Sequence, residues 1–100
     1  MAAVKVAISA KLVAKPGKEE EVAALLKSGL ALVQEEPGTI QWFAIRFNQN
    51  TFGIFDSFAG EEGRNAHLSG KLAAALMAKA GDLLAQPPSI EKVDVIASKT

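Results

Sequence analysis

Cysteine and tyrosine are absent from this 100-residue chain, and histidine occurs once. Without cysteine there is no disulfide framework, no thiolate zinc site and no cysteine nucleophile. A single histidine excludes a multi-histidine metal site within one chain, and the lack of tyrosine excludes a phenolic proton shuttle from the protein. We therefore expect neither a metal nor a cofactor, and few side chains remain for acid–base chemistry.

Charge of one sign and long apolar runs are also missing. Lys+Arg and Asp+Glu both total 11, and just two of these residues are arginine. Nucleic-acid-binding surfaces are usually basic, and sites that bind phosphate favour arginine over lysine. No apolar run approaches the roughly 20 residues that cross a bilayer, and lysines interrupt the N-terminal segment where a signal peptide would be apolar. We expect a cytoplasmic protein with no nucleic-acid or membrane partner.

The first half of the chain predicts a strand followed by a helix. From Val4 to Leu12 the even positions are all apolar, a period of two that is typical of a strand with one buried face. Pro16 and Gly17 end this strand, and three glutamates follow where the positive end of a helix dipole favours negative charge. An apolar stripe at helical spacing then runs to the break at "EPG"; its members are Val22, Leu25, Leu26, Gly29, Leu30 and Val33.

The second half predicts a hairpin, a helical segment and a last strand. "TIQWFAIRF" and "TFGIFDSF" are rich in aromatic and β-branched residues, and "NQN" between them offers asparagines that can take positive φ in a turn. Residues 61–84 predict a helix that is interrupted near Gly70, and "IEKVDVIA" predicts a short strand. The order β-α-β-β-α-β predicts an α+β, ferredoxin-like domain over residues 1–100, with a four-stranded antiparallel sheet and both helices on one face.

Both faces of the second predicted strand are apolar. The chain's own helices can cover one face of the sheet, and a large exposed apolar patch usually marks an interface. The alternative is an apolar strand that stays solvated. We expect a homodimer that forms through the sheet faces. One face of the strand carries Ile40, Trp42 and Ala44, and the other carries Phe43, Ile45 and Phe47.

Three stretches, "KPGKEEEVAALL", "EPGTIQW" and "FDSFAGEEGRNAHLSG", in this order of elements, resemble the antibiotic biosynthesis monooxygenase domain family of the dimeric α/β-barrel superfamily. The resemblance runs from about Val4 to about Ala97. It implies a homodimer in which two sheets close into a barrel. It also implies activities that include cofactor-independent oxygenation of quinols and aromatic phenols.

The resemblance also bears on haem chemistry. In the haem-degrading branch of the family, the histidine that matches His67 ligates iron, together with a tryptophan on the third strand and an asparagine on the first. Here the third strand carries phenylalanine, and the first strand carries Ala10 or Ser9 at that place. Haem degradation is therefore not expected.

The candidate catalytic residues are His67, Arg64 and Asp56. His67 has an ordinary pKa near ~6.5, which suits deprotonation of a phenol, and glycines four residues before and three after predict open space around its ring. The alternative is a histidine that docks its helix. Arg64, one turn earlier, either stabilises a phenolate or pairs with Glu61 at the surface. Asp56, in an apolar strand, either orients His67 or caps the next helix.

The candidate substrate-binding residues are Trp42, Phe52 and Ile54, which either line a flat cavity for an aromatic ligand or belong to an ordinary core. Phe52 and Ile54 share the strand face of Asp56. The sequence predicts a cofactor-independent monooxygenase acting on a quinol or another electron-rich aromatic molecule. The alternative is a non-catalytic or regulatory dimer that binds a small apolar metabolite.

Overall fold

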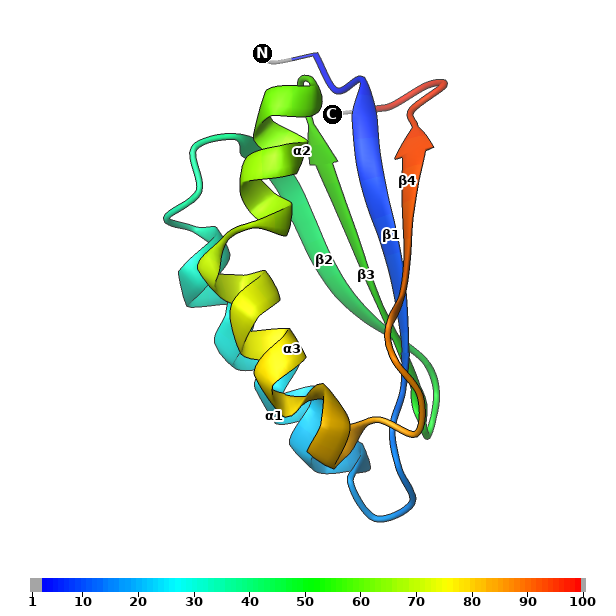
Figure 1. Cartoon of the computed structure of the whole chain (residues 1–100). Helices are drawn as coiled ribbons and strands as arrows, with labels where there is room; N and C mark the ends of the chain where they lie inside the picture. The colour runs from blue at the N-terminus through cyan, green and yellow to red at the C-terminus, as the bar shows by residue number, and fades with distance from the viewer. Residues whose placement is uncertain (1–2, 100) are drawn as a thin grey trace.

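Four strands form an antiparallel sheet in the order β2-β3-β1-β4, and three helices lie on one of its faces (Figure 1). The computed structural model describes residues 3–99. This arrangement confirms the predicted α+β, ferredoxin-like fold. In chain order the elements are β1 (Val6–Val13), α1 (Glu19–Val33), β2 (Thr39–Asn48), β3 (Thr51–Phe58), α2 (Glu61–Leu68), α3 (Lys71–Leu83) and β4 (Ser89–Asp94).

The alternation in β1 decides which side of the sheet is covered. Ile8, Ala10 and Leu12 are buried, whereas Ser9 and Lys11 between them are exposed. Because successive side chains of a strand point to opposite faces, the even positions of β1 face the helices. The core between sheet and helices is formed mainly by aliphatic residues of β1, α1 and α3, with Phe52 and Ile54 from β3.

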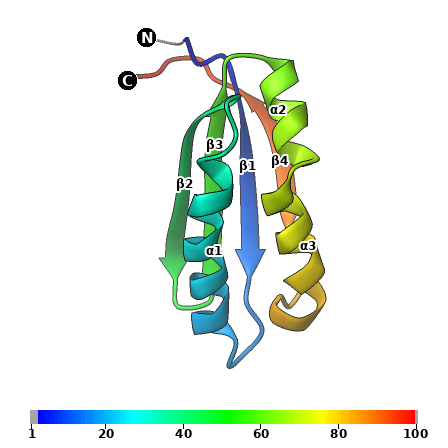
Figure 2. The ribbon, with the colours of Figure 1, turned by 90° about the vertical axis from the view of Figure 1, so that its left-hand side faces the viewer.

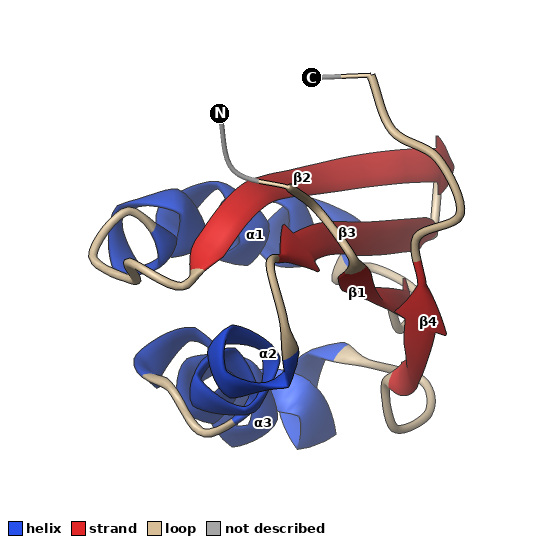
Figure 3. Ribbon diagram, turned by 90° about the horizontal axis from the view of Figure 1, so that it is seen from above, coloured by secondary structure: helices blue, strands red, loops and turns tan. Residues whose placement is uncertain are grey.

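The helices divide the sheet between them. Helix α1 lies in front of β2 and β3, and α2 and α3 lie beside it toward β4, with α2 also reaching β2 and β3 (Figure 2). The predicted interruption near Gly70 is confirmed, because α2 ends at Leu68 and α3 begins at Lys71. Helix α2 packs closely on β1, β2 and β3, while α3 packs on α1. Seen from above, the strands twist strongly from β2 to β4 beside these helices (Figure 3).

The β2–β3 turn corrects one detail of the sequence-based prediction. No non-glycine residue between positions 3 and 99 has a positive φ, so the asparagines do not use the left-handed region. Side chains hold the turn instead. The Asn50 backbone N–H donates to Asn48 Oδ1 at 3.1 Å, and the Arg46 guanidinium donates to the carbonyl oxygens of Asn48 and Gln49 at 3.3 and 2.8 Å.

The face of the sheet that the helices leave open is apolar. Phe43 pairs in register with Phe55, so these two side chains share a side with the other odd-numbered residues of β2. The Lys11 amino group lies 5.4 Å from the centre of the Phe47 ring on the same face. We call this surface the open sheet face; its large apolar residues, with their exposed fractions, are Phe43 (52%), Ile45 (44%), Phe47 (60%) and Phe55 (37%). Within the described part of the chain, no helix has the length and apolar character needed to cross a membrane.

Candidate active site

A carboxylate stands in the middle of the covered face of the sheet. Asp56 lies on β3 two residues after Ile54, and it is fully buried. Its register partners are Ile8 on β1 and Trp42 on β2. A charge at such an apolar position is costly unless a partner neutralises it. The partner comes from the helix layer.

The imidazole of His67, in the last turn of α2, lies between two carboxylates. Its Nε2 is 2.6 Å from Asp56 Oδ2, and its Nδ1 is 2.6 Å from Glu36 Oε1. The ring of Phe58 packs against it, with ring centres 5.4 Å apart. His67 is 7% exposed. The structure thus brings together two of the predicted catalytic residues, Asp56 and His67, from elements that are adjacent in the fold.

The predicted open space around His67 is wrong. The backbone of Gly63 lies against the α1–β2 turn, where an added Cβ would be 2.7 Å from the carbonyl oxygen of Gly38. An added Cβ at Gly70 would be 3.0 Å from Glu36 Oε2. Both glycines therefore allow neighbouring segments to approach closely, and neither leaves open space for a ligand.

The charge of His67 follows from this setting. Burial by itself lowers the pKa of a histidine, but the contacts with Asp56 and Glu36 outweigh burial and raise the pKa of His67 from 6.5 to about 9. At neutral pH the ring is an imidazolium with an N–H on each nitrogen. It has no free lone pair, so the predicted role of His67 as a neutral-pH base does not fit this geometry.

Two buried polar groups beside each other lack hydrogen-bond partners. Asp56 Oδ1 has none among residues 3–99, whereas Oδ2 is held by the ion pair with His67 Nε2 at 2.6 Å. The Trp42 indole N–H is likewise buried and unpartnered in the described chain. Trp42 and Asp56 are direct neighbours across β2 and β3. Buried polar groups are rarely left unpaired, so this pair is a candidate binding feature.

A narrow cavity opens beside Asp56 and His67. It has a volume of about 40 Å³ and is walled by apolar side chains, among them Ile54, Leu72 and Ile90. That volume admits water molecules but is smaller than a phenol ring. Ile90, on the edge strand β4, is 45% exposed at this place. On the other side the cavity is closed by α3, through Leu72 and Leu76.

Of the remaining predicted site residues, Arg64 and Phe52 lie outside the cavity and Ile54 lines it. Arg64 is buried, and its guanidinium donates to the carbonyl oxygens of Ala7 and Val93, both at 3.2 Å, and pairs with Glu61. It ties α2 to β1 and β4, so the alternative of a pair with Glu61 is found, although not as a surface pair. Phe52 is part of the core, whereas Ile54 reaches the cavity wall.

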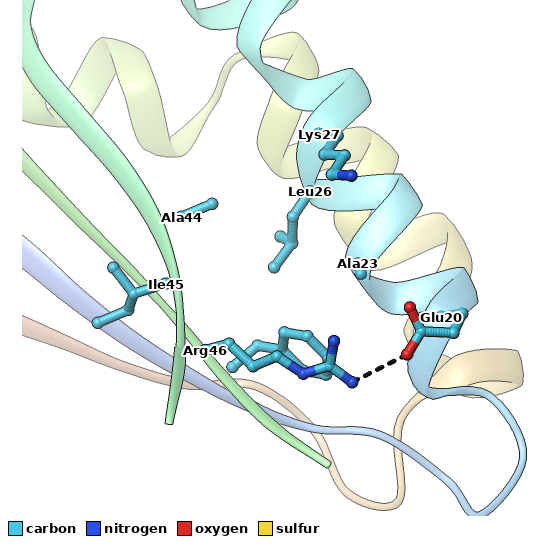
Figure 4. A pocket seen from close by; sticks show the side chains of 8 residues that line it. Glu20, Ala23, Leu26, Lys27, Ala44, Ile45 and Arg46 are labelled. Carbon is cyan, nitrogen blue, oxygen red and sulfur yellow. Dashed lines mark hydrogen bonds and ion pairs between the residues drawn. The ribbon is translucent and has the colours of Figure 1, made fainter. Parts of the chain in front are cut away.

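A second hollow lies between α1 and β2. This groove of about 250 Å³ contains Arg46, whose NH2 lies 3.0 Å from Glu20 Oε2, and Figure 4 shows this pair spanning from the strand to the helix. The Arg46 guanidinium also lies 4.8 Å from the centre of the Phe52 ring. Since the same guanidinium closes the β2–β3 turn, Arg46 has a structural task at this position.

Sequence reasoning did not single out Glu36. It follows α1 and was noted there as part of the "EPG" helix stop, and its contact with His67 joins positions 31 residues apart. The two carboxylates lie on opposite sides of the imidazole, so their oxygens do not converge. Within residues 3–99, no group of three or more His, Cys, Asp or Glu side chains is placed so that it could hold a metal ion.

Comparison with known proteins places the fold. No family model matches the chain, and no curated protein matches it. The crystal structure of NE2512, a protein of unknown function from Nitrosomonas europaea, is 52% identical with a TM-score of 0.95, covering 97% of this chain and 94% of that chain. A candidate antibiotic biosynthesis monooxygenase from Caulobacter crescentus is 22% identical (TM-score 0.80; 94% and 92% covered). Another from Nitrosomonas europaea is 13% identical (TM-score 0.82; 92% and 99% covered).

Proposed function

Because this chain belongs to the family of Nitrosomonas europaea NE2512 and has the fold of the antibiotic biosynthesis monooxygenases, we propose that it is a cofactor-independent monooxygenase. Its substrate is a quinol or another electron-rich aromatic molecule that carries a hydroxyl group. The observation that carries this proposal is the buried, unpartnered Oδ1 of Asp56 in the wall of an apolar cavity. Trp42, whose indole N–H is also buried and unpartnered, does not line that cavity but is the register neighbour of Asp56 on β2.

A phenolic hydroxyl satisfies both groups at once. Its oxygen accepts a hydrogen bond from the Trp42 indole N–H, and its proton is donated to a carboxylate oxygen of Asp56. Asp56 is the general base, and the imidazolium of His67 balances its charge. The cavity is smaller than a phenol ring, so the proposal requires that it widen by movement of Ile90 or α3 when the ligand enters. Its apolar walls then suit the ring of the ligand and keep water from the reacting anion.

The reaction needs molecular oxygen and no other oxidant. Once Asp56 has taken the hydroxyl proton, the ring anion gives one electron to O₂ and combines with the superoxide that forms. The resulting peroxide loses water, so that a ring C–H carbon becomes C=O. One atom of O₂ enters the substrate, and the other leaves as water. The two hydrogens of that water are the hydrogen of the ring carbon and the proton that Asp56 took, so the carboxylate is restored.

The charges of the site favour a neutral ligand. Asp56, His67 and Glu36 together carry a net charge of minus one when the ring is protonated. The buried cation nearby in sequence, Arg64, is already engaged by Glu61 and backbone carbonyls. A carboxylate-bearing ligand would meet Asp56 without a free cation, and like charges at close range are strongly unfavourable. Stabilisation of a phenolate by Arg64 is not part of the proposal.

The proposed enzyme is a homodimer. The open sheet face exposes four large apolar side chains in register on neighbouring strands, and an isologous pair of such faces would bury them. In this assembly the two sheets pack face to face, with the helices outside. The candidate site, which lies on the helix side of each sheet, stays within its own protomer.

Phenol and its methyl ether, anisole, test the site directly. The chain has one tryptophan, so Trp42 fluorescence reports occupancy without labelling. We expect phenol to change this fluorescence at concentrations where anisole does not, because anisole cannot donate to Asp56. Oxygen uptake with a panel of quinols then tests catalysis.

The variant Asp56→Asn should lower turnover by ~100-fold or more, the usual worth of a general base. The control Asp82→Asn changes an exposed aspartate on α3 and should leave turnover unchanged. Phenol binding without oxygen uptake by any quinol would make the chain a small-molecule-binding protein instead. Equal binding of phenol and anisole would contradict the hydroxyl site.

A further inference from the structure

We propose that Glu36 is a positioning residue of this site. From the far side of the ring it holds His67 so that Nε2–H faces Asp56, and it thereby leaves the Asp56 carboxylate as the group that takes the ligand's proton. The orientation of the ring rests on geometry alone, whereas its effect on the ligand rests on the proposed function.

The carboxylate of Glu36 is itself held in place. Its Oε1 lies 2.6 Å from His67 Nδ1 and accepts a hydrogen bond from Thr39 Oγ1 at 2.7 Å. Its Oε2 lies against the α2–α3 junction, since a Cβ added at Gly70 would be 3.0 Å away. The side chain is 19% exposed, compared with 1% for Asp56. Glu36 therefore reaches the buried ring from the α1–β2 turn in one well-defined orientation.

The chemistry of imidazole makes this contact necessary. A neutral ring has one N–H and one lone pair, and it can turn either nitrogen toward Asp56. With the lone pair on Nε2, two acceptors would face each other across 2.6 Å. A second carboxylate at Nδ1 favours the ring with both N–H groups present, because each then has an acceptor. Second acceptors of this kind orient functional imidazoles in metal sites too.

Apart from Asp56 and Glu36, the charged groups on the elements around the ring have other partners or lie exposed. Asp56 is the titratable group that β3 presents to His67, and the Arg64 side chain on α2 is turned to Glu61 and backbone oxygens. At the start of α3, Lys71 lies 3.8 Å from Glu35, both highly exposed. On β4, Lys92 is exposed. The other cavity walls from β1, α3 and β4 include Ile8, Leu72 and Ile90.

Nuclear magnetic resonance of the single histidine tests the first half of the proposal. His67 gives a unique ring Cε1–H signal, so its titration midpoint can be read in the intact protein. We expect Glu36→Gln to lower the midpoint by about one unit or more, since an opposite charge in contact has been removed. Glu35→Gln, a matched change one residue earlier, should leave the midpoint in place. Glu36→Asp keeps the charge, and its midpoint should lie between those of the Gln variant and the wild type.

Phenol binding tests the second half. Glu36→Gln should weaken phenol binding and lower turnover by about 10-fold, as for other residues that orient a functional imidazole, and Glu36→Asp should restore part of the loss. A midpoint that Glu36→Gln leaves unchanged overturns the proposal. A lowered midpoint with wild-type phenol affinity also overturns it, while the proposed function stands. If the wild type binds no phenol, the proposed function fails, and a lowered midpoint then identifies Glu36 as a structural partner of His67, against the proposal.

Discussion

At the scale of single residues, the charge of His67 depends on a neighbour that sequence reasoning could not choose. Asp56 was a candidate partner because a carboxylate in an apolar strand needs one. Glu36 is one of two acidic residues just after α1, and nothing in "EEPG" distinguishes it from Glu35. The difference is set by the turn, which directs Glu36 inward while Glu35 pairs with Lys71 at the surface.

The raised pKa of His67 predicts a loss of stability at alkaline pH. Protonation of a group whose folded pKa exceeds its unfolded value stabilises the folded state. With pKa values of 6.5 unfolded and about 9 folded, this contribution is complete below pH 6.5 and is lost as pH rises through 9. At about 1.4 kcal/mol per pKa unit, His67 contributes at most about 3 kcal/mol to the free energy of unfolding. Denaturant unfolding between pH 6 and 10 measures it, and His67→Gln should flatten the curve. A wild-type curve that is already flat would contradict the ion pairs.

Trp42 gives a second prediction at this scale. Trp42→Phe loses packing area, which destabilises the fold, but it also removes an unpartnered buried N–H, which stabilises it. Because the two effects oppose each other, the free energy of unfolding should fall by no more than about 1 kcal/mol. The hydroxyl of the ligand loses its donor, so phenol affinity should fall about 10-fold, which corresponds to roughly 1.4 kcal/mol. Thermal unfolding and calorimetric titration measure the two effects separately. A large loss of stability with unchanged phenol affinity would assign Trp42 to the core alone.

At the scale of elements, local sequence signals predicted most of the fold. Alternation in β1, three glutamates at the start of α1 and the break near Gly70 all act within a few residues, so the sequence carries them directly. Close approaches between elements, by contrast, are not predicted by such local signals. Gly63 was interpreted as open space beside His67, yet it is the point where α2 meets the α1–β2 turn, which local periodicity does not encode.

Two glycines that both lie in helices should therefore respond oppositely to alanine. Gly63→Ala in α2 would place a Cβ 2.7 Å from the Gly38 carbonyl oxygen, and backbone must shift. We expect a loss of about 1–3 kcal/mol, typical of overpacking. Gly81→Ala in α3 meets nothing within 4 Å and should stabilise by up to about 1 kcal/mol through helix propensity. Urea unfolding compares them. Equal effects would show that the α2 contact is not tight.

At the scale of the whole molecule, the two faces of the sheet have different roles. The helix side holds the core and the candidate site, whereas the open sheet face exposes large apolar residues that contribute nothing to either. Alternation in β2 predicted this division, because the period of two assigns each side chain to a face without knowledge of the rest of the fold. The cavity could not be predicted in the same way, since its walls come from both layers.

The open sheet face predicts that the chain forms a homodimer in solution. Light scattering at micromolar concentration should give twice the 10.5 kDa chain mass, because apolar faces of this kind are typical of stable dimers. Phe43→Glu puts a charge into the proposed interface, and burying an unpaired charge there should weaken association by ~100-fold or more. Met77→Glu is the matched control: this residue is 57% exposed on α3, in the helix layer, and its substitution should leave the dimer intact. A monomeric wild type, or equal dissociation of both variants, would mean that the open sheet face is not the interface.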